Sequence, residues 1–469
     1  MPLTNCPPKS ARPYHCKVAT GRTGKTEIEK MAGNSSRDNF KNRDLDRCGQ
    51  ELYQLIVALY PICRSITGDG FRQSLRQLQA VVPLVLHEVP SGSQVFDWTV
   101  PKEWNIRDAW IKNARGEKVV DFSISNLHVL NYSVPVHRKM RLAELKEHLF
   151  TLPDKPDWIP YRTSYYKETW GFCLSHHQWE QLRDEEYEIC IDSTLEPGHL
   201  SYGEFRIQGT TEEEVLISCH SCHPSLCNDN LSGMVVAAKL AQTLVDMSLR
   251  YSYRFLWVPG TIGAITWLAL NEMALSRIKH GLVLSCLGDP GCFNYKRSRQ
   301  GNAGIDRVVE HALRHAGNDF AGSDFSPYGY DERQYCSPGI NLPVGCLMRT
   351  PNGKYPQYHT SADDLSFVKP EALAGSLDQL LGIVRILEKN HVYLNLNPKC
   401  EPQLGRRGLY RLMGGASGSV LEEAILWVLN QSDGDHSLLD IAERSKLGFD
   451  TITEAAEALL KSGLLREVG

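Results

Sequence analysis

The stretch of residues 215–244 reads VLISCHSCHPSLCNDNLSGMVVAAKLAQTL, which predicts a strand, a loop of ligand-type residues and a helix. Its first three residues are β-branched or aliphatic and predict a buried strand. Its last fourteen are apolar on nearly every side, which is typical of a helix packed against a sheet. Ligands of open α/β sheets bind beyond the carboxyl ends of the strands. The loop between this strand and helix, with His220, His223 and Asp229, is therefore expected to carry a site.

Length and composition limit the classes of protein that this chain can be. It has 469 residues, 42% hydrophobic and 23% charged, with a formal net charge of −4. This predicts two or three globular domains and gives no reason to expect nucleic acid as a partner. No run reaches the roughly 18 apolar residues of a membrane span, and the first residues have no apolar signal core, so we expect a cytoplasmic protein without a membrane partner. The fourteen cysteines are expected to be free thiols.

The chain before the central stretch changes character twice. Residues 1–45 are basic with almost no aliphatic pattern and are expected to form a disordered tail. Two amphipathic helices follow, in ELYQLIVALYPI (51–62) and FRQSLRQLQAVV (71–82). Residues 91–199 are rich in Trp, Tyr and Val in short alternating runs. This pattern predicts a β-rich inserted domain whose aromatic residues could shape a substrate pocket.

Strands alternate with helices from about residue 203 to residue 392. This alternation predicts an α/β fold, with a mostly parallel mixed sheet flanked by helices. We expect this α/β segment and the N-terminal helices to form one discontinuous domain of residues 46–90 and 200–395.

The last segment, 405–469, contains three short helical patterns and a terminal strand-like LLREV, and is predicted to be a winged helix. From His436 onward it carries four Lys or Arg against six Asp or Glu. A domain that binds nucleic-acid phosphates should have a basic surface. We therefore favour a structural or protein-contact role for this segment.

The central loop carries residues with zinc-binding chemistry. Histidine nitrogen and aspartate oxygen bind zinc where positions must stay open for water and substrate. Asp229 alone could equally cap a helix. Similar residues follow other predicted strands, however: Asp289 in SCLGDPG (285–291) and His359 in YPQYHTSADDL (355–365). We therefore expect Asp229, Asp289 and His359 to converge on one cation.

Several motifs resemble the two-zinc aminopeptidase superfamily, whose members carry a His at a strand end, a bridging Asp in an Asp-Asn-x-Ser-Gly turn, a later acidic ligand and a His in a Tyr-His-Thr-x-x-Asp stretch. The segments SCHSCHPSLCNDNLSG, VPGTIGAITWL, YKRSRQGNAGIDR, DERQYCSPGINLPVG and YHTSADDL are also similar to a bacterial group of aminopeptidase-like proteins that end in a winged helix. The resemblance covers about residues 49–469. It implies zinc as the cofactor.

The resemblance also implies a set of ligands. Asp229 would bridge two zincs, Asp289 and one loop histidine would bind the first, and His359 would bind the second. His220 is in register with the family histidine. His223 is an alternative, as a ligand, a partner of a ligand or a contact to substrate.

One departure from the family pattern affects catalysis. Active members carry a Glu-Glu pair after the next strand, whereas Gly260 and Thr261 stand at that place here. The missing general base could be replaced by Asp331, Glu332 or Glu272. Without such a carboxylate, which contributes roughly 10²–10⁴ in rate, hydrolysis would persist slowly. One zinc, or a loosely held pair, is then expected.

The expected function is zinc-dependent hydrolysis of an amide or peptide bond in a small peptide or amide substrate, by an aminopeptidase or amidase. Arg333, Tyr335 or Tyr358 could steady the oxyanion. The alternative is a non-catalytic or polysaccharide-biosynthesis-associated binding protein with the same fold. A closed Cys/His zinc site or redox pair at Cys219 and Cys222 is a weaker alternative. The sequence leaves open whether the chain forms a homo-oligomer.

Overall fold

The computed structural model describes residues 35–317, 319–409 and 420–468, and the chain divides into a unit up to Asp44 and a unit from Leu45. Most of the predicted tail lies outside the described residues. The first helix, α1 (Ser35–Leu59), already begins within the range predicted for that tail. No helix in the described part of the chain combines the length and apolar character needed to cross a membrane.

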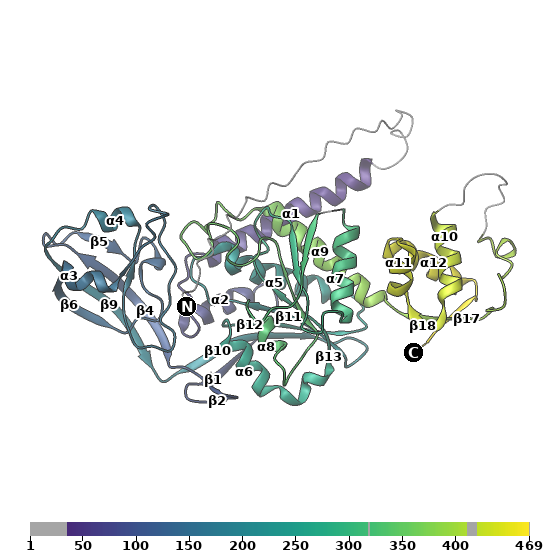
Figure 1. Ribbon diagram of the computed structural model, residues 1–469, viewed down its shortest axis with the longest axis horizontal. Coiled ribbons are helices and arrows are strands. Elements are labelled where there is room, and N and C mark those ends of the chain that lie inside the picture. The colour runs from purple at the N-terminus through teal and green to yellow at the C-terminus, as the bar shows by residue number, and fades with distance from the viewer. Residues whose placement is uncertain (1–34, 318, 410–419, 469) are drawn as a thin grey trace, which may run out of the picture. The chain divides into compact units, whose positions relative to one another are not determined.

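An eight-stranded mixed sheet forms the centre of the second unit (Figure 1). Its four inner strands are parallel to one another, and antiparallel pairings occur toward both edges, which confirms the predicted mixed α/β sheet. The strands in spatial order are β1 (Val85–Pro90), β10 (His199–Ile207), β12 (Ser252–Val258), β11 (Glu214–His220), β13 (Ile278–Leu284), β16 (Val344–Met348), β14 (Phe293–Lys296) and β15 (Phe320–Ser323).

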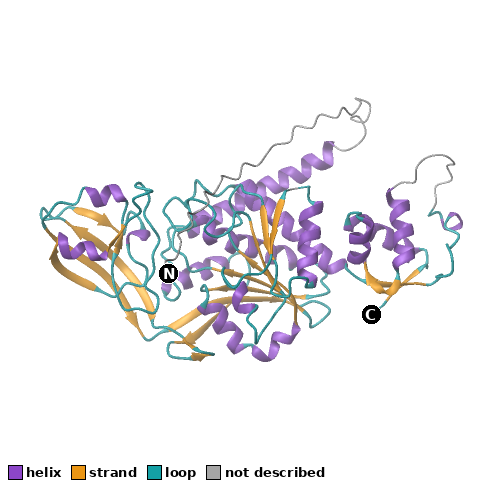
Figure 2. Cartoon of the chain, in the orientation of Figure 1, coloured by secondary structure: helices purple, strands orange, loops and turns teal. Residues whose placement is uncertain are grey.

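Helices cover both faces of this sheet (Figure 2). On one face α5 packs against α9 and α9 against α7, while α6 and α8 pack together on the other. A parallel sheet needs such cover because both of its faces are apolar. The helices of this domain are α1, α2 (Asp69–Leu78), α5 (Ser232–Leu244), α6 (Ile262–Leu270), α7 (Gly304–His315), α8 (Glu332–Tyr335) and α9 (Pro370–Lys389).

The β-rich inserted domain lies in the chain between β1 and β10. Its main sheet has four strands in the order β5-β4-β9-β6, all antiparallel. Along β9, Tyr187, Ile189 and Ile191 are buried and alternate with partly exposed residues, as expected for a strand with one covered face. The elements are β2 (Gln94–Val95), β3 (Trp98–Thr99), β4 (Glu103–Lys112), β5 (Lys118–Asp121), β6 (Val136–Arg141), α3 (Leu142–Leu145), β7 (Leu149–Phe150), β8 (Phe172–Cys173), α4 (His176–Glu180) and β9 (Glu186–Glu196).

The C-terminal segment combines three helices with a three-stranded sheet ordered β18-β17-β19. The sheet includes β17, which precedes the predicted start at residue 405, so the domain begins earlier than predicted. The elements are β17 (Val392–Asn395), α10 (Val420–Gln431), β18 (Asp433–Ser437), α11 (Leu438–Ser445), α12 (Phe449–Lys461) and β19 (Leu465–Glu467).

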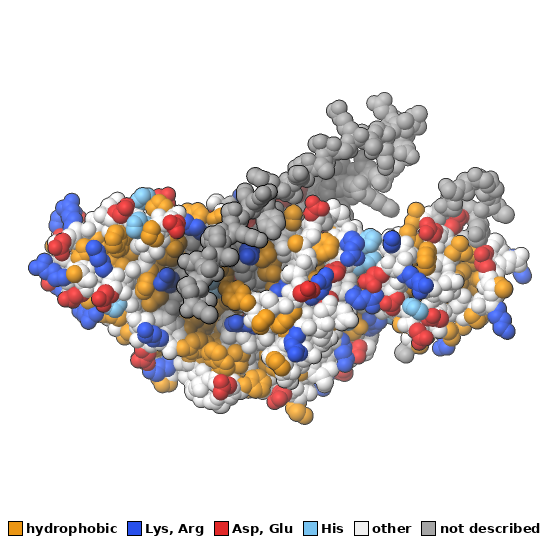
Figure 3. All heavy atoms as spheres, in the orientation of Figure 1, with side chains coloured by type: hydrophobic (Ala, Val, Ile, Leu, Met, Phe, Trp, Pro, Cys, Tyr) orange, Lys and Arg blue, Asp and Glu red, His pale blue; other side chains and the backbone are white. Residues whose placement is uncertain are grey.

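Ion pairs join the last helix of this domain to α9. Arg385 lies 3.1 Å from Asp450, and Lys389 lies 2.8 Å from Glu457. Acidic side chains of α12 are thus already engaged with bases of the preceding domain. On the face shown in Figure 3, Lys and Arg side chains are interspersed with Asp and Glu rather than gathered into one patch.

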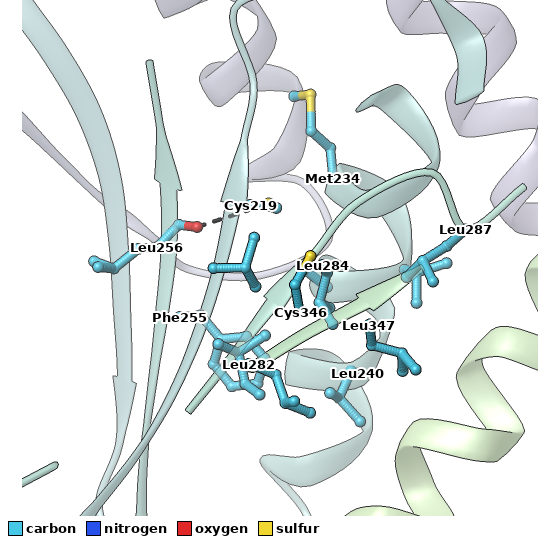
Figure 4. Close-up of a cluster of buried hydrophobic side chains, with 14 of the residues drawn as sticks. Cys219, Met234, Leu240, Phe255, Leu256, Leu282, Leu284, Leu287, Cys346 and Leu347 are labelled. Atoms are coloured by element: carbon cyan, nitrogen blue, oxygen red, sulfur yellow. Dashed lines mark hydrogen bonds between the residues drawn. The ribbon is translucent and has the colours of Figure 1, made fainter. Parts of the chain in front are cut away.

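The apolar core beneath the site holds the inner strands in place. Figure 4 shows side chains of α5 interdigitating with those of the strands, among them Cys219, Met234, Leu240, Phe255, Leu256, Leu282, Leu284, Leu287, Cys346 and Leu347. Full burial of each large apolar side chain contributes about 1.5–3 kcal/mol. Because β11, β12, β13 and β16 are fixed in this way, the loops after their carboxyl ends start from defined positions.

Candidate metal centre

Three histidines converge on one aspartate at the carboxyl edge of the sheet. His220 Nε2 lies 2.7 Å from Asp229 Oδ1, and His359 Nε2 lies 3.0 Å from Asp229 Oδ2. His223 Nδ1 lies 3.8 Å from Asp229 Oδ1. His220 and Asp229 are fully buried, His223 is 6% exposed and the side chain of His359 is 35% exposed. The structure thus brings four of the five predicted ligands together.

Asp229 is held by the loop that carries His359. The carboxylate of Asp363 accepts the backbone N–H groups of Asn228, at 2.6 Å, and of Asp229, at 3.0 Å. The Asp229–Asn230 peptide bond is cis. Asp363 therefore fixes the backbone from which the Asp229 side chain reaches all three histidines.

The neighbouring asparagine ties this turn to two strand ends. Asn230 Nδ2 donates to the carbonyl oxygens of His220 and Leu284, and its Oδ1 accepts the N–H of Cys286. The Asn after Asp229 in the sequence motif therefore locks the turn onto the ends of β11 and β13.

Asp289 does not join the cluster. Its carboxylate accepts Thr350 Oγ1–H at 2.6 Å, the Thr350 N–H at 3.1 Å, the Gly291 N–H and the Asn228 amide. Both oxygens are thus engaged in holding loops. The structure does not bring Asp289 to Asp229 and His359, contrary to the convergence expected from the sequence.

The charge states suit a cation. Burial opposes ionisation of Asp229, but His223, His220 and His359 together hold the pKa of its carboxyl well below its usual range. Burial lowers the pKa of His223, so its imidazole is neutral. Burial, and then the Asp229 charge, raise the pKa of Asp363 to about 8. Metals bind ionised carboxylates and neutral imidazoles, the forms favoured for Asp229 and His223.

These residues fit zinc. Three imidazole nitrogens and a carboxylate are ligand types that zinc accepts. The ligand-type atoms of His220, His223 and Asp229 all lie within 4.8 Å of one another. His223 Nδ1 is buried and has no hydrogen-bond partner among the described residues. An unpaired polar atom facing a carboxylate across 3.8 Å is explained if a cation lies between them.

Aromatic rings from two domains enclose the histidines. Tyr161, from the inserted domain, meets His223 and His359 edge-on, with ring centroids 5.0 and 5.1 Å apart. Tyr358 stacks on His359 at 3.9 Å. The Tyr161 N–H also donates to the His359 carbonyl at 2.8 Å. Tyr161 thus brings the inserted domain into contact with the histidine cluster.

A buried cation supports the His223 loop from behind. Arg64 is fully buried, and its Nε donates to the His223 carbonyl at 3.0 Å. Its Nη1 donates to the Leu59 carbonyl at 2.7 Å, while Nη2 has no partner among the described residues. Burial lowers the pKa of Arg64 to about 10. Its guanidinium therefore links the end of α1 to a candidate ligand.

The predicted replacement bases lie in different surroundings. Asp331 is fully buried, accepts the Thr261 N–H at 2.6 Å, and has a second oxygen without a partner among the described residues. Burial raises its pKa to about 7. Glu332 is paired with Lys296 at 2.6 Å, and Glu272 is exposed. Asp331 thus combines an oxygen that has no partner among the described residues with a pKa near neutrality.

The three candidate residues for steadying the oxyanion also lie in different surroundings. The Tyr335 hydroxyl lies 2.8 Å from Ser218 Oγ beneath the site, so it is engaged in the core. Arg333 has a buried Nε without a partner in the described part of the chain. Tyr358 lies beside the most exposed ligand, His359.

The Cys-x-x-Cys thiols do not form a metal site. Cys219 Sγ points to the Leu256 carbonyl, at 3.7 Å, and Cys222 Sγ accepts the Gly260 N–H at 3.2 Å. All the cysteines within the described ranges are free, as predicted for those positions.

Four residues of the site were missed by the sequence interpretation: Arg64, Tyr161, Asp363, and Tyr330, whose ring stacks on His220 with centroids 3.6 Å apart. Asp363 stands in the quoted ADDL motif and could have been found there, whereas the other three lie far from the central loop in sequence.

The fold and the cluster define an aminopeptidase-like protein with a candidate metal centre. The chain belongs to the family described as "Domain of unknown function (DUF4910)", whose model matches residues 53–390, and a winged helix-turn-helix model matches residues 391–467. The winged helix therefore starts at about residue 391, where β17 places it.

Two of the matches, a relative and a solved structure, both from Clostridium acetobutylicum, cover nearly the whole chain. One, named "Putative polysaccharide biosynthesis protein with aminopeptidase-like domain", is 53% identical over 443 residues, which is 94% of this chain and all of the relative. A crystal structure described as a "putative peptidase" is 51% identical, with a TM-score of 0.88, and covers 92% of this chain and 99% of that one.

More distant structures share the fold. A zinc aminopeptidase from Bacillus subtilis is 14% identical with a TM-score of 0.53, covering 72% of this chain and 94% of that one. A peptidase M28 precursor from Shewanella amazonensis is 13% identical with a TM-score of 0.52. The match covers 75% of this chain and 97% of that one. The predicted aminopeptidase-like fold with a C-terminal winged helix is thus confirmed.

Proposed function

We propose that this chain is a zinc-dependent hydrolase of an amide or peptide bond in a small substrate. The observation that carries the proposal is the convergence of three histidine nitrogens on the buried, ionised Asp229. The aminopeptidase-like fold and the zinc aminopeptidase among its structural neighbours support it. The name of the 53% identical relative suggests a link to polysaccharide synthesis, where an N-acylated amino sugar would offer an amide bond.

The four clustered residues would hold the metal. His220 and His223 lie on the Oδ1 side of Asp229, and His359 lies on the Oδ2 side. Bound zinc would supply a Lewis acid that polarises a carbonyl and acidifies water. Since His359 is the most exposed of the four, substrate would approach from its side, between Tyr358 and Tyr161.

Asp331 is our candidate for proton transfer. A group whose pKa lies near the working pH can both accept and return a proton, and such catalysis contributes roughly 10²–10⁴ in rate. Its pKa of about 7 and its unpartnered oxygen support this role. Among the described residues no hydrogen bond joins Asp331 to the four ligands, so it would act on substrate or water. Arg333 and Tyr358 are the candidates for steadying the carbonyl oxygen.

A binding protein is the second candidate function. It is favoured by Gly260 and Thr261, which offer no carboxylate beside the cluster. Such a protein would keep zinc and substrate contacts but turn over nothing.

One experiment separates these candidates. The full chain is assayed on aminoacyl amides, dipeptides and N-acetyl amino sugars after chelation and after addition of zinc. We expect hydrolysis that zinc restores, that D229N abolishes, and that the matched control D364N keeps, because Asp364 caps only the local turn at Ser366. Zinc binding without turnover of any substrate would favour the binding protein.

A further inference from the structure

Gly260 and Tyr330 are sterically coupled. A Cβ atom added at Gly260 would lie 2.2 Å from the Tyr330 hydroxyl oxygen and 2.7 Å from Cε1 and Cζ of the ring. Contacts this short do not occur, so a side chain at 260 and the Tyr330 ring exclude each other. The position that lacks a carboxylate is therefore filled by a phenol from 70 residues further along the chain.

Tyr330 touches two candidate ligands at once. Its ring stacks on His220, with centroids 3.6 Å apart, and its hydroxyl lies 3.5 Å from His223 Nε2. The hydroxyl is also 4.0 Å from Cys222 Sγ, which accepts the Gly260 N–H. The Tyr330 side chain thus covers the part of the histidine cluster formed by His220 and His223.

The two ring nitrogens of His223 face different partners. Nδ1 points to Asp229, while Nε2 points to the Tyr330 hydroxyl. A histidine that binds a metal through one nitrogen carries its proton on the other, and an outer partner for that proton fixes the tautomer and the ring orientation. Among the described residues, the Tyr330 hydroxyl is the one group placed to do this for His223.

The surrounding loop holds Tyr330 in place. Its N–H donates to the Glu332 carboxylate at 3.1 Å, and Glu332 is paired with Lys296. The adjacent Asp331 accepts the Thr261 N–H, which ties the Tyr330 loop to the Gly260 turn. Thr261 itself has φ 65° and ψ −70°, a rare and strained turn. The hydrogen bond between Thr261 and Asp331 thus joins the two loops directly beside the Gly260–Tyr330 contact.

We infer that Tyr330 is a positioning residue of the metal centre, which orients His223 by a hydrogen bond and His220 by stacking, and that Gly260 is the residue that admits it. This inference rests on the metal centre of the proposed function. In this chain, the position where active family members carry the Glu-Glu pair then serves to hold the metal ligands in place.

The first test measures zinc affinity directly, by competition with a chromophoric chelator. Removal of an outer partner of a metal ligand typically costs 10–100-fold in affinity, and we expect that loss for Y330F. The matched control is Y335F, which removes the hydroxyl of another buried tyrosine that bonds only Ser218. Y335F should bind zinc like the wild type.

The outcomes separate this inference from the proposed function. Wild-type affinity in Y330F would overturn the orientation of His223 by the Tyr330 hydroxyl. A second outcome is that Y330F binds zinc more weakly than the wild type while the wild type hydrolyses none of the substrates. That result would support the positioning role of Tyr330 and overturn only the proposed hydrolase activity. A wild type that takes up no zinc would overturn both.

A second test needs no metal. G260A should lower the melting temperature by several degrees, because its Cβ displaces the Tyr330 ring. In the double variant G260A/Y330A the clash is gone, so its loss should be smaller than the sum of the two single losses. Additive losses would contradict the coupling.

Discussion

His359 and Asp229 lie 130 residues apart in the chain, and yet His359 Nε2 is 3.0 Å from Asp229 Oδ2. The contact joins the loop after β16 to the turn that opens α5. On the other oxygen of the same carboxylate lies His220. An aspartate shared in this way by imidazoles from a strand end and a distant loop is the feature from which the metal centre follows.

Arg64 should be important for stability. Replacing it with alanine leaves the carbonyl oxygen of His223 buried without a donor, at about 1–3 kcal/mol, and removes one of the two donors to the Leu59 carbonyl, the other being the Ile62 N–H. We expect R64A to lower the urea midpoint strongly. The control is R76A, at an exposed arginine of α2, which should change stability by no more than about 0.5 kcal/mol. Equal midpoints for the two variants would contradict the role of Arg64.

Asp331 should make stability depend on pH. Its pKa is raised in the folded state to about 7, so the folded chain keeps a proton that the unfolded chain releases from about pH 4. The contribution of Asp331 is therefore full below pH 4 and is lost as the pH rises to 7. D331N should remove this decline, so its unfolding free energy relative to the wild type should increase between pH 4 and pH 7. A difference in unfolding free energy that is independent of pH would contradict the raised pKa of Asp331.

Asp331 should also shape the pH dependence of any hydrolysis. If it accepts the proton, kcat/KM should rise through an apparent pKa near 7 in the wild type. In D331N the rate should fall by roughly 10²-fold or more, and this rising limb should disappear. An unchanged profile in D331N would assign the proton transfer to another group.

The winged helix should not bind DNA through α12. This helix presents Asp450, Glu454 and Glu457, and two of them are paired with arginine or lysine of α9. Phosphate binding needs a basic surface and weakens steeply with salt. Fluorescence anisotropy with duplex DNA should show no submicromolar binding of the full chain at 50 mM salt. Tight binding that is lost at 200 mM salt would establish a nucleic-acid interface.

Much of the architecture could be predicted because it depends on local patterns. The apolar run at Val215 became β11, and the apolar stretch 231–244 became α5, since burial on both faces of a sheet imposes such sequences. The start of the winged helix was placed too late, because β17 is only four residues long and has little signal of its own.

The site was only partly predictable because side-chain partners are set by tertiary contacts. Asp289 follows a strand, as a ligand would, but Thr350 from the neighbouring loop takes its carboxylate. Asp363 and Asp364 are adjacent and chemically alike, yet only Asp363 reaches the Asp229 turn. Nothing local to Tyr330 shows that its ring fills the space beside Gly260.

The most direct test is a crystal structure of the zinc-loaded chain with anomalous diffraction on both sides of the zinc edge. We expect an anomalous peak bound by Asp229 together with nitrogens of His220, His223 or His359, at about 2.0–2.2 Å. We also expect Asp289 to stay bonded to Thr350. A peak coordinated by Asp289, or no peak between Asp229 and the histidines, would contradict the proposed metal centre.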